Sequence, residues 1–109
     1  MDAESPLLAF TTCPDVESAR RIARSLVESR LAACVNVLPA MQSIYRWKGK
    51  VEEASEHLLI MKVSRTNYGN LEQRIRELHP YELPEIVAVS IDAGLPAYLA
   101  WIVDPDRTP

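Results

Sequence analysis

The order of hydrophobic patterns along the chain predicts an α+β fold, in which two helices cover one face of an antiparallel sheet. Three observations carry this prediction. A short apolar run precedes an amphipathic helical pattern, a long hairpin pattern fills the middle of the chain, and a second helical pattern ends at prolines before another apolar run. We therefore expect strand, helix, two hairpin strands, helix and strand, in that order.

The first strand is expected over residues 7–12, an apolar run that ends in two β-branched threonines. A helix then begins after Cys13, with Pro14 in its first turn and Asp15 near its positive end. Apolar residues recur along it at spacings of three and four, as in a helix that lies on a sheet. The apolar side holds Val16, Ala19, Ile22, Ala23, Leu26 and Val27.

A second strand is expected over residues 34–38, where Pro39 bends or ends it. The strand pattern then resumes over residues 41–48, and a return strand runs from Val51 to about Arg65. Together these segments form a hairpin that is long for a chain of this size.

The turn of this hairpin is expected at Gly49-Lys50, a type II′ pattern with glycine at the first central position. In that register Arg46 faces Glu53, and the two make a favourable cross-strand pair. Tyr45 and Trp47 lie on one face. Because an isolated two-stranded ribbon is marginal in water, we expect a neighbouring subunit to cover these aromatics, with packing on the chain's own helices as the alternative.

The second helix follows a turn-rich segment, in which Asn67 or Asn70 is the expected cap, and it ends at His79-Pro80. Residues 86–91 are expected to form a buried strand.

A turn at residues 92–94 and Pro96 then lead into a short final helix, and residues 104–109 form a frayed tail. The whole order is βαββαβ with a short C-terminal helix, which is the ferredoxin-like sandwich. With 109 residues, we expect one domain spanning 1–109, with an ordered core at about residues 6–103.

Composition narrows the classes of partner. The net charge of −3 and the lack of a basic stripe argue against nucleic acid, and no apolar stretch is long enough to span a membrane. The acidic N-terminus does not resemble a signal peptide, so we expect a cytoplasmic protein in which both cysteines are reduced. No organic cofactor motif occurs.

The densest cluster of functional groups lies on a proline-constrained connector over residues 79–86. His79, Glu82 and Glu85 are candidate ligands for Cu²⁺ or another divalent cation, weakly bound, since copper heads the affinity order for nitrogen and oxygen sites. The structural alternative is that His79 caps the helix end while both glutamates face water. A hydrolase, using Cys34 with His79 or Glu82 with Glu85, is a further alternative; otherwise no enzymatic site is expected.

Five motifs then indicate a family. They are Ala33-Cys34-Val35-Asn36-Val37, Ser43-x-Tyr45-x-Trp47-x-Gly49, Glu56-x-x-Leu59-Ile60-Met61-Lys62, His79-Pro80-Tyr81-Glu82-x-Pro84-Glu85-Ile86 and Tyr98-Leu99-x-Trp101-Ile102. In order and spacing the chain resembles the CutA divalent-cation tolerance proteins, from about Leu7 to Val103. The resemblance implies a homotrimer similar in architecture to the PII signalling proteins, with Tyr45 and Trp47 at the trimer interface.

The resemblance also implies a non-enzymatic role in tolerance of divalent cations, copper above all. Family members are described as binding copper through a thiol at the end of the first strand and the histidine before the proline-tyrosine pair. Here His79 matches that histidine, Thr11 stands at the thiol position with Cys13 nearby, and Leu78 stands where some members have a second histidine.

The motif residues that are expected to line a cleft between subunits are Cys34, Lys62, Tyr81 and Trp101, with the motif glutamates beside them. The alternative function is therefore that of a signalling or scaffold protein, similar to the PII proteins, which binds a small molecule or a protein partner in this cleft.

Overall fold

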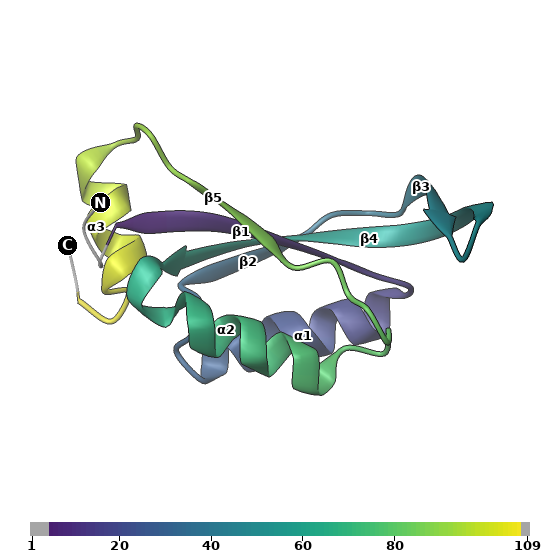
Figure 1. Ribbon diagram of the computed structural model, residues 1–109. Coiled ribbons are helices and arrows are strands. Elements are labelled where there is room, and N and C mark those ends of the chain that lie inside the picture. Colours follow the sequence, from purple (N-terminus) through teal and green to yellow (C-terminus); the bar gives the residue numbers. More distant parts are fainter. Residues whose placement is uncertain (1–4, 108–109) are drawn as a thin grey trace.

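The computed structural model describes residues 5–107 and confirms the predicted order of elements (Figure 1). The elements are β1 (Pro6–Cys13), α1 (Val16–Glu28), β2 (Cys34–Val37), β3 (Met41–Trp47), β4 (Lys50–Ser64), α2 (Arg65–Leu78), β5 (Val87–Ser90) and α3 (Pro96–Val103). No helix among these residues is long and apolar enough to cross a membrane.

The sheet is antiparallel and its main body has the order β2-β4-β1-β5, while β3 pairs with the outer half of β4. This is the ferredoxin-like arrangement. The 15-residue β4 runs through both the body and the hairpin, so the β3–β4 ribbon extends away from the rest of the molecule (Figure 1). The molecule is elongated as a result, at 47 × 25 × 23 Å.

The core lies between the sheet and the two long helices, which are seen side by side below the sheet in Figure 1. Alternate residues of β1 and β4 point toward these helices, as the two-residue repeat of a strand requires. The largest fully buried side chains include Leu59, Met61 and Val63 from β4, Ile22 and Leu26 from α1, and Leu71 and Ile75 from α2.

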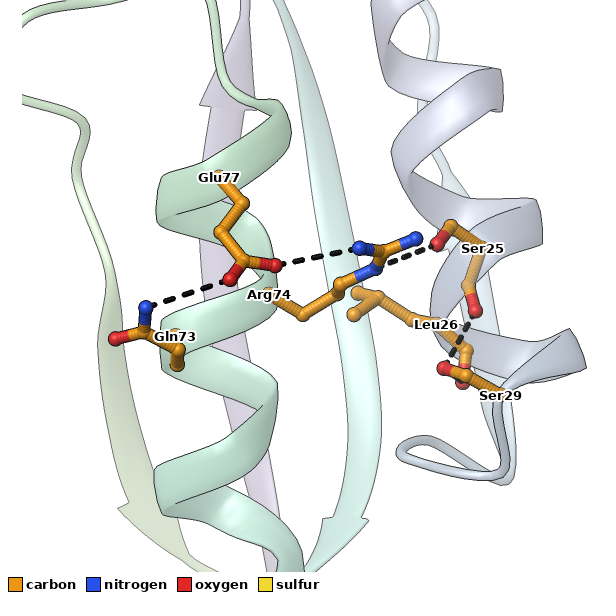
Figure 2. A network of polar contacts seen from close by, with 6 residues as sticks. All are labelled: Ser25, Leu26, Ser29, Gln73, Arg74 and Glu77. Atoms are coloured by element: carbon orange, nitrogen blue, oxygen red, sulfur yellow. Dashed lines mark hydrogen bonds and ion pairs between the residues drawn. The ribbon is translucent and has the colours of Figure 1, made fainter.

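A polar network ties α2 to α1 along their exposed edges (Figure 2). The Arg74 guanidinium donates from Nε to the Ser25 hydroxyl at 3.1 Å and from NH1 to Glu77 at 3.2 Å. The Ser29 hydroxyl donates to the Ser25 carbonyl at 2.7 Å, which secures the end of α1. One bond of this network, from Arg74 to Ser25, joins the two helices, whereas the other two lie within α2 and at the end of α1.

Both helix starts differ in detail from the prediction. Asp15 is the N-cap of α1 and accepts the Ser18 amide at 2.7 Å, so Pro14 precedes the helix and does not lie in its first turn. Helix α2 begins directly after β4, where Ser64 accepts the Asn67 amide at 3.2 Å. The predicted caps Asn67 and Asn70 are wrong, because a serine at the strand end caps the helix before the turn-rich residues are reached.

Two apolar residues of α1 are more exposed than the pattern predicted. Val16 and Val27 have exposed fractions of 44% and 42%, and they lie near the two ends of the helix.

The predicted hairpin register is also wrong. Trp47 pairs with Lys50, so the central turn residues are Lys48 and Gly49, with φ of 50° and 80°. Positive φ at both positions fits a type I′ turn, whose twist matches that of the flanking strands. Arg46 consequently faces Val51 and not Glu53, and the predicted charge pair does not form.

The face of the sheet opposite α1 and α2 is largely uncovered. Strand β5 was predicted to be buried, but it is an edge strand whose Val87 and Val89 have exposed fractions of 50% and 52%. Helix α3 lies at one end of this face, near the start of β1 (Figure 1). The register places six apolar residues on the uncovered side, and we call them the outer face: Leu8, Phe10, Leu58, Ile60, Val87 and Val89.

Candidate functional site

The motif segment over residues 79–86 leaves the end of α2 and runs without regular structure to β5. His79 is the C-cap residue of α2, and its amide donates to the Ile75 carbonyl at 2.8 Å. Pro80 stops the helix there, because proline lacks an amide hydrogen and disfavours helical geometry at the residue before it.

Both ring nitrogens of His79 are engaged. Nε2 lies 2.7 Å from the Thr12 carbonyl oxygen, and Nδ1 accepts the Tyr81 amide at 3.1 Å. A carbonyl only accepts and an amide only donates, so Nε2 carries the hydrogen and the imidazole is neutral. Burial lowers the pKa of His79, although the bond to Thr12 opposes this. The exposed fraction of His79 is 8%, so neither nitrogen is free toward solvent.

The thiol nearest to this imidazole belongs to Cys13, whose Sγ lies 3.8 Å from Nε2. Strand β1 extends to Cys13, so this cysteine and not Thr11 occupies the strand end beside the histidine. Cys13 is fully buried, and burial raises the pKa of its thiol to about 11. The thiol is therefore protonated at neutral pH.

The Tyr81 side chain is held by a buried carboxylate, that of Glu56. Its hydroxyl donates to Glu56 Oε2 at 2.7 Å, and the exposed fraction of Glu56 is only 7%. Burial, followed by the hydrogen bond to Glu56, raises the pKa of Tyr81 well above its ordinary value. The Tyr81 ring also packs on the His79 ring, with centroids 4.8 Å apart. The phenol thus remains a hydrogen-bond donor across the neutral pH range.

A groove of about 580 Å³ opens beside this pair, and we call it the Tyr81 groove. Its walls come from the end of β1, the hairpin and the motif segment, and the lining residues are Thr12, Ser43, Ile44, Tyr45, Trp47, Glu56, Tyr81, Glu82, Leu83 and Glu85. Three of these are carboxylates, three are aromatic, and none of the described lining residues is basic. His79 lies behind the groove wall and does not line it.

The donor chemistry of this groove is that of oxygen. Carboxylates, hydroxyls and a phenol suit harder divalent cations, whereas copper gains most from nitrogen or thiolate ligands. Within residues 5–107, no three His, Cys, Asp or Glu side chains converge closely enough to hold a metal ion. Glu82 and Glu85 thus share the groove, but the residues of one chain do not fit a preformed copper cage with His79.

The other predicted cleft residues gather elsewhere. The Lys62 ammonium donates to the Tyr98 hydroxyl at 3.0 Å and lies 3.9 Å from Cys34 Sγ. The rings of Tyr98 and Trp101 are 5.5 Å apart. The hydrogen bond with Tyr98 raises the pKa of Lys62. We call these four residues the Lys62 cluster.

The Lys62 cluster and the Tyr81 groove are separate in a single chain. Lys62 and Glu56 are six positions apart on β4, which at about 3.3 Å per residue corresponds to roughly 20 Å. Cys34 pairs with Lys62 in the sheet, while His79 contacts the far end of β1, so the pairing of Cys34 with His79 needed for a thiol nucleophile is absent.

Tyr45 and Trp47 lie on the projecting hairpin, where they line the Tyr81 groove with exposed fractions of 43% and 39%. The Lys48 ammonium lies 5.7 Å from the Trp47 ring centroid, a cation–π contact at the hairpin tip. Within residues 5–107, β3, which carries these aromatics, packs mainly on β4, and packing on the chain's own helices was the alternative to an intersubunit role.

Sequence reasoning did not assign a role to Glu56, Thr12, Ser43 or Tyr98. Glu56 belongs to one of the recognised motifs, and its even spacing from Lys62 along a strand would have placed it on the same face. No pattern in the sequence indicates that the Thr12 carbonyl accepts a hydrogen bond from a residue 67 positions away.

Comparisons with known proteins agree on one family. The family model described as "CutA1 divalent ion tolerance protein" matches residues 7–105. Protein CutA of Mus musculus is 48% identical over 94 residues, which are 86% of this chain and 53% of the mouse protein. The divalent-cation tolerance protein CutA of Thermus thermophilus is 50% identical over 95 residues, covering 87% of this chain and 92% of that protein.

Solved structures give the same result. The crystal structure of CutA from Xylella fastidiosa superimposes with a TM-score of 0.87 at 48% identity, covering 90% of this chain and 94% of that one. The chain thus spans about half the length of its mouse relative but nearly the whole of the bacterial proteins.

Proposed function

The chain belongs to the CutA1 family of divalent ion tolerance proteins, and we propose that it acts in this tolerance as a non-enzymatic homotrimer that binds divalent cations weakly in the Tyr81 groove. Copper is included among these cations, since Cu²⁺ binds most tightly among first-row divalent metals to any set of nitrogen and oxygen donors.

One observation carries the proposal: the groove contains three carboxylates, from Glu56, Glu82 and Glu85, and none of its lining residues within 5–107 is basic enough to neutralise them. A cation entering the groove gains from all three charges. The carboxylates do not form a preformed cage, so the expected binding is weak and depends on hydration water or on a neighbouring subunit for further ligands.

The test is a calorimetric titration of tag-free protein with Cu²⁺ in the absence of reducing agents. The double variant Glu82→Gln/Glu85→Gln is expected to bind at least tenfold more weakly, or about 1.4 kcal/mol. Glu28→Gln is the control, because Glu28 is an exposed carboxylate on α1 that pairs with Arg24 of the same helix, at 3.6 Å. Equal affinities in all three proteins would overturn the groove as the cation site.

A homotrimer is supported by the outer face. Six apolar side chains lie on the side of the sheet away from α1 and α2, and they include the half-exposed Val87 and Val89 on an edge strand. Contiguous exposed apolar surface of this kind marks an interface, and the unpaired backbone of an edge strand favours it further.

Light scattering tests this assembly. Val89→Glu places a charge in the outer face and is expected to shift the protein to smaller species at micromolar concentration. Val16→Glu changes a valine of similar exposure (44%) on α1 and is expected to leave assembly unchanged. A Val89→Glu protein of unaltered mass would contradict an interface at the outer face.

We propose no enzymatic step. The Cys13 thiol and the His79 imidazole are both neutral and buried, and Cys34 has no histidine within reach. We also propose a cytoplasmic location, supported by the two unpaired cysteines, which are usual in a reducing compartment.

A second candidate function is supported by the Lys62 cluster. A charged ammonium held between a phenol and a thiol, with the Tyr98 ring packed on Trp101, could bind an anionic small molecule or an acidic protein segment in the intersubunit cleft. A pulldown with and without added metal distinguishes the two candidates. Recovery of one partner in both conditions, lost in Lys62→Met, favours the second candidate, whereas recovery that requires metal favours the first.

A further inference from the structure

The imidazole of His79 joins two walls of the Tyr81 groove. Its Nε2 donates to the carbonyl of Thr12 in the first wall, at 2.7 Å, and its Nδ1 accepts the amide of Tyr81 in the second, at 3.1 Å. Thr12 is nearly buried, with 6% exposed, as is His79. Two hydrogen bonds between uncharged groups, one buried and one partly buried, hold the start of the motif segment against the end of β1.

These bonds conflict with metal ligation by His79. A metal ion needs a ring nitrogen with a free lone pair, and in this tautomer the only lone pair lies on Nδ1, which the Tyr81 amide occupies. Binding at Nε2 requires loss of the hydrogen that bonds Thr12. The nearest soft donor, Cys13, is a fully buried thiol, and within the described residues no third ligand completes a site.

We propose that His79 is a positioning residue of the Tyr81 groove and not a metal ligand: it fixes Tyr81 so that the phenol meets Glu56 and the following glutamates face the groove. The Tyr81 ring packs on the imidazole at 4.8 Å between centroids while its hydroxyl reaches Glu56 at 2.7 Å. His79 therefore positions both the backbone amide and the ring of Tyr81. This inference deepens the proposed function, since the groove is the same.

The tautomer is measured on the unchanged protein and without metal. Nitrogen-15 spectra of the imidazole are expected to show a protonated Nε2 and an unprotonated, hydrogen-bonded Nδ1. A protonated Nδ1 would overturn the inference, because that ring could not accept the Tyr81 amide. The tautomer does not depend on the cation affinity of the groove. If the groove proved not to bind cations, the tautomer result would still stand.

Three variants separate positioning from ligation. The side-chain oxygen in His79→Asn can replace Nδ1 as the acceptor for Tyr81, the side-chain amide in His79→Gln can replace Nε2 as the donor to Thr12, and His79→Ala replaces neither. Hydrogen exchange of the Tyr81 amide is expected to be at least tenfold faster in His79→Ala and His79→Gln than in His79→Asn. Equal exchange in all three would contradict the positioning role.

Cu²⁺ titration of the same proteins gives the second readout. If His79 positions the groove, His79→Asn binds Cu²⁺ at least tenfold more tightly than His79→Ala, although asparagine provides no imidazole nitrogen. If His79 is a ligand, His79→Asn loses at least tenfold in affinity together with His79→Ala. The second result would overturn the inference while leaving the carboxylate variants free to test the groove.

Discussion

Replacement of Tyr81 by phenylalanine removes one hydroxyl from the wall of the groove and leaves its ring in place. The hydroxyl donates to Glu56 at 2.7 Å, and with Glu56 only 7% exposed, water has little access to the carboxylate oxygen that loses its donor. Hydrogen bonds to charged groups contribute about 1.5–3 kcal/mol, and we expect Tyr81→Phe to lie near the lower end because Tyr81 itself is half-buried.

A double-mutant cycle isolates the pair. Tyr81→Phe, Glu56→Gln and the double variant are unfolded in urea at one fixed protein concentration, since assembly makes stability depend on concentration. We expect a coupling energy of about 1–2 kcal/mol, within the range of contacting residues. Tyr68→Phe is the control, because the Tyr68 hydroxyl contacts Glu72 at 3.1 Å within one helix, a contact of at most about 0.5 kcal/mol.

The cycle can refute the argument in two ways. If the losses in the free energy of unfolding of the two single variants add up to that of the double variant within about 0.3–0.5 kcal/mol, the hydroxyl and the carboxylate do not interact in solution. An equal loss in the free energy of unfolding in Tyr68→Phe and Tyr81→Phe would mean that the burial of Glu56 does not strengthen its hydrogen bond with Tyr81.

Four other changes test separate parts of the structure. Ser64→Ala removes the cap that accepts the Asn67 amide and is expected to lower the free energy of unfolding by about 1 kcal/mol; no loss in urea would contradict that cap. Burial raises the pKa of the Cys13 thiol from 9.0 to about 11, so the stability that this thiol contributes is complete below pH 9 and is lost as the pH rises through 11. The fall in the free energy of unfolding between pH 9 and pH 11 should therefore be smaller in Cys13→Ala, and an equal fall in both proteins would exclude the thiol as its source. Lys48 has a positive φ of 50°, which asparagine adopts at a lower cost than lysine, so Lys48→Asn is expected to stabilise the protein by up to about 1 kcal/mol and to raise its melting temperature; a lower melting temperature would argue against the type I′ turn. Trp47→Ala is expected to weaken assembly by about 2 kcal/mol, measured by light scattering on dilution, and an unchanged dissociation profile would exclude the hairpin from the interface.

The sequence was sufficient for the order of elements because each element has a strong local signal. The three- and four-residue spacing of α1, the prolines after His79 and the glycine near the hairpin tip all act within a few residues. The errors arose where two local signals competed. Ser64 capped α2 ahead of Asn67, and Lys48 adopted positive φ, which moved the turn back by one residue.

The candidate site was predictable only in part, since its contacts join distant parts of the chain. Sequence reasoning selected the motif segment and placed a thiol near His79 through the family resemblance. It could not show that the Thr12 carbonyl and the Tyr81 amide occupy both imidazole nitrogens, because those contacts depend on where α2 ends relative to β1. The exposure of β5 likewise depends on an uncovered sheet face and not on its apolar sequence.

The most direct measurement is anomalous diffraction at the copper edge, from crystals of the protein soaked in Cu²⁺. We predict a peak in the Tyr81 groove within bonding distance of Glu82 or Glu85, with His79 Nε2 still hydrogen-bonded to the Thr12 carbonyl. A peak bonded to an imidazole nitrogen of His79, with the hydrogen bond to Thr12 or Tyr81 broken, would contradict this prediction.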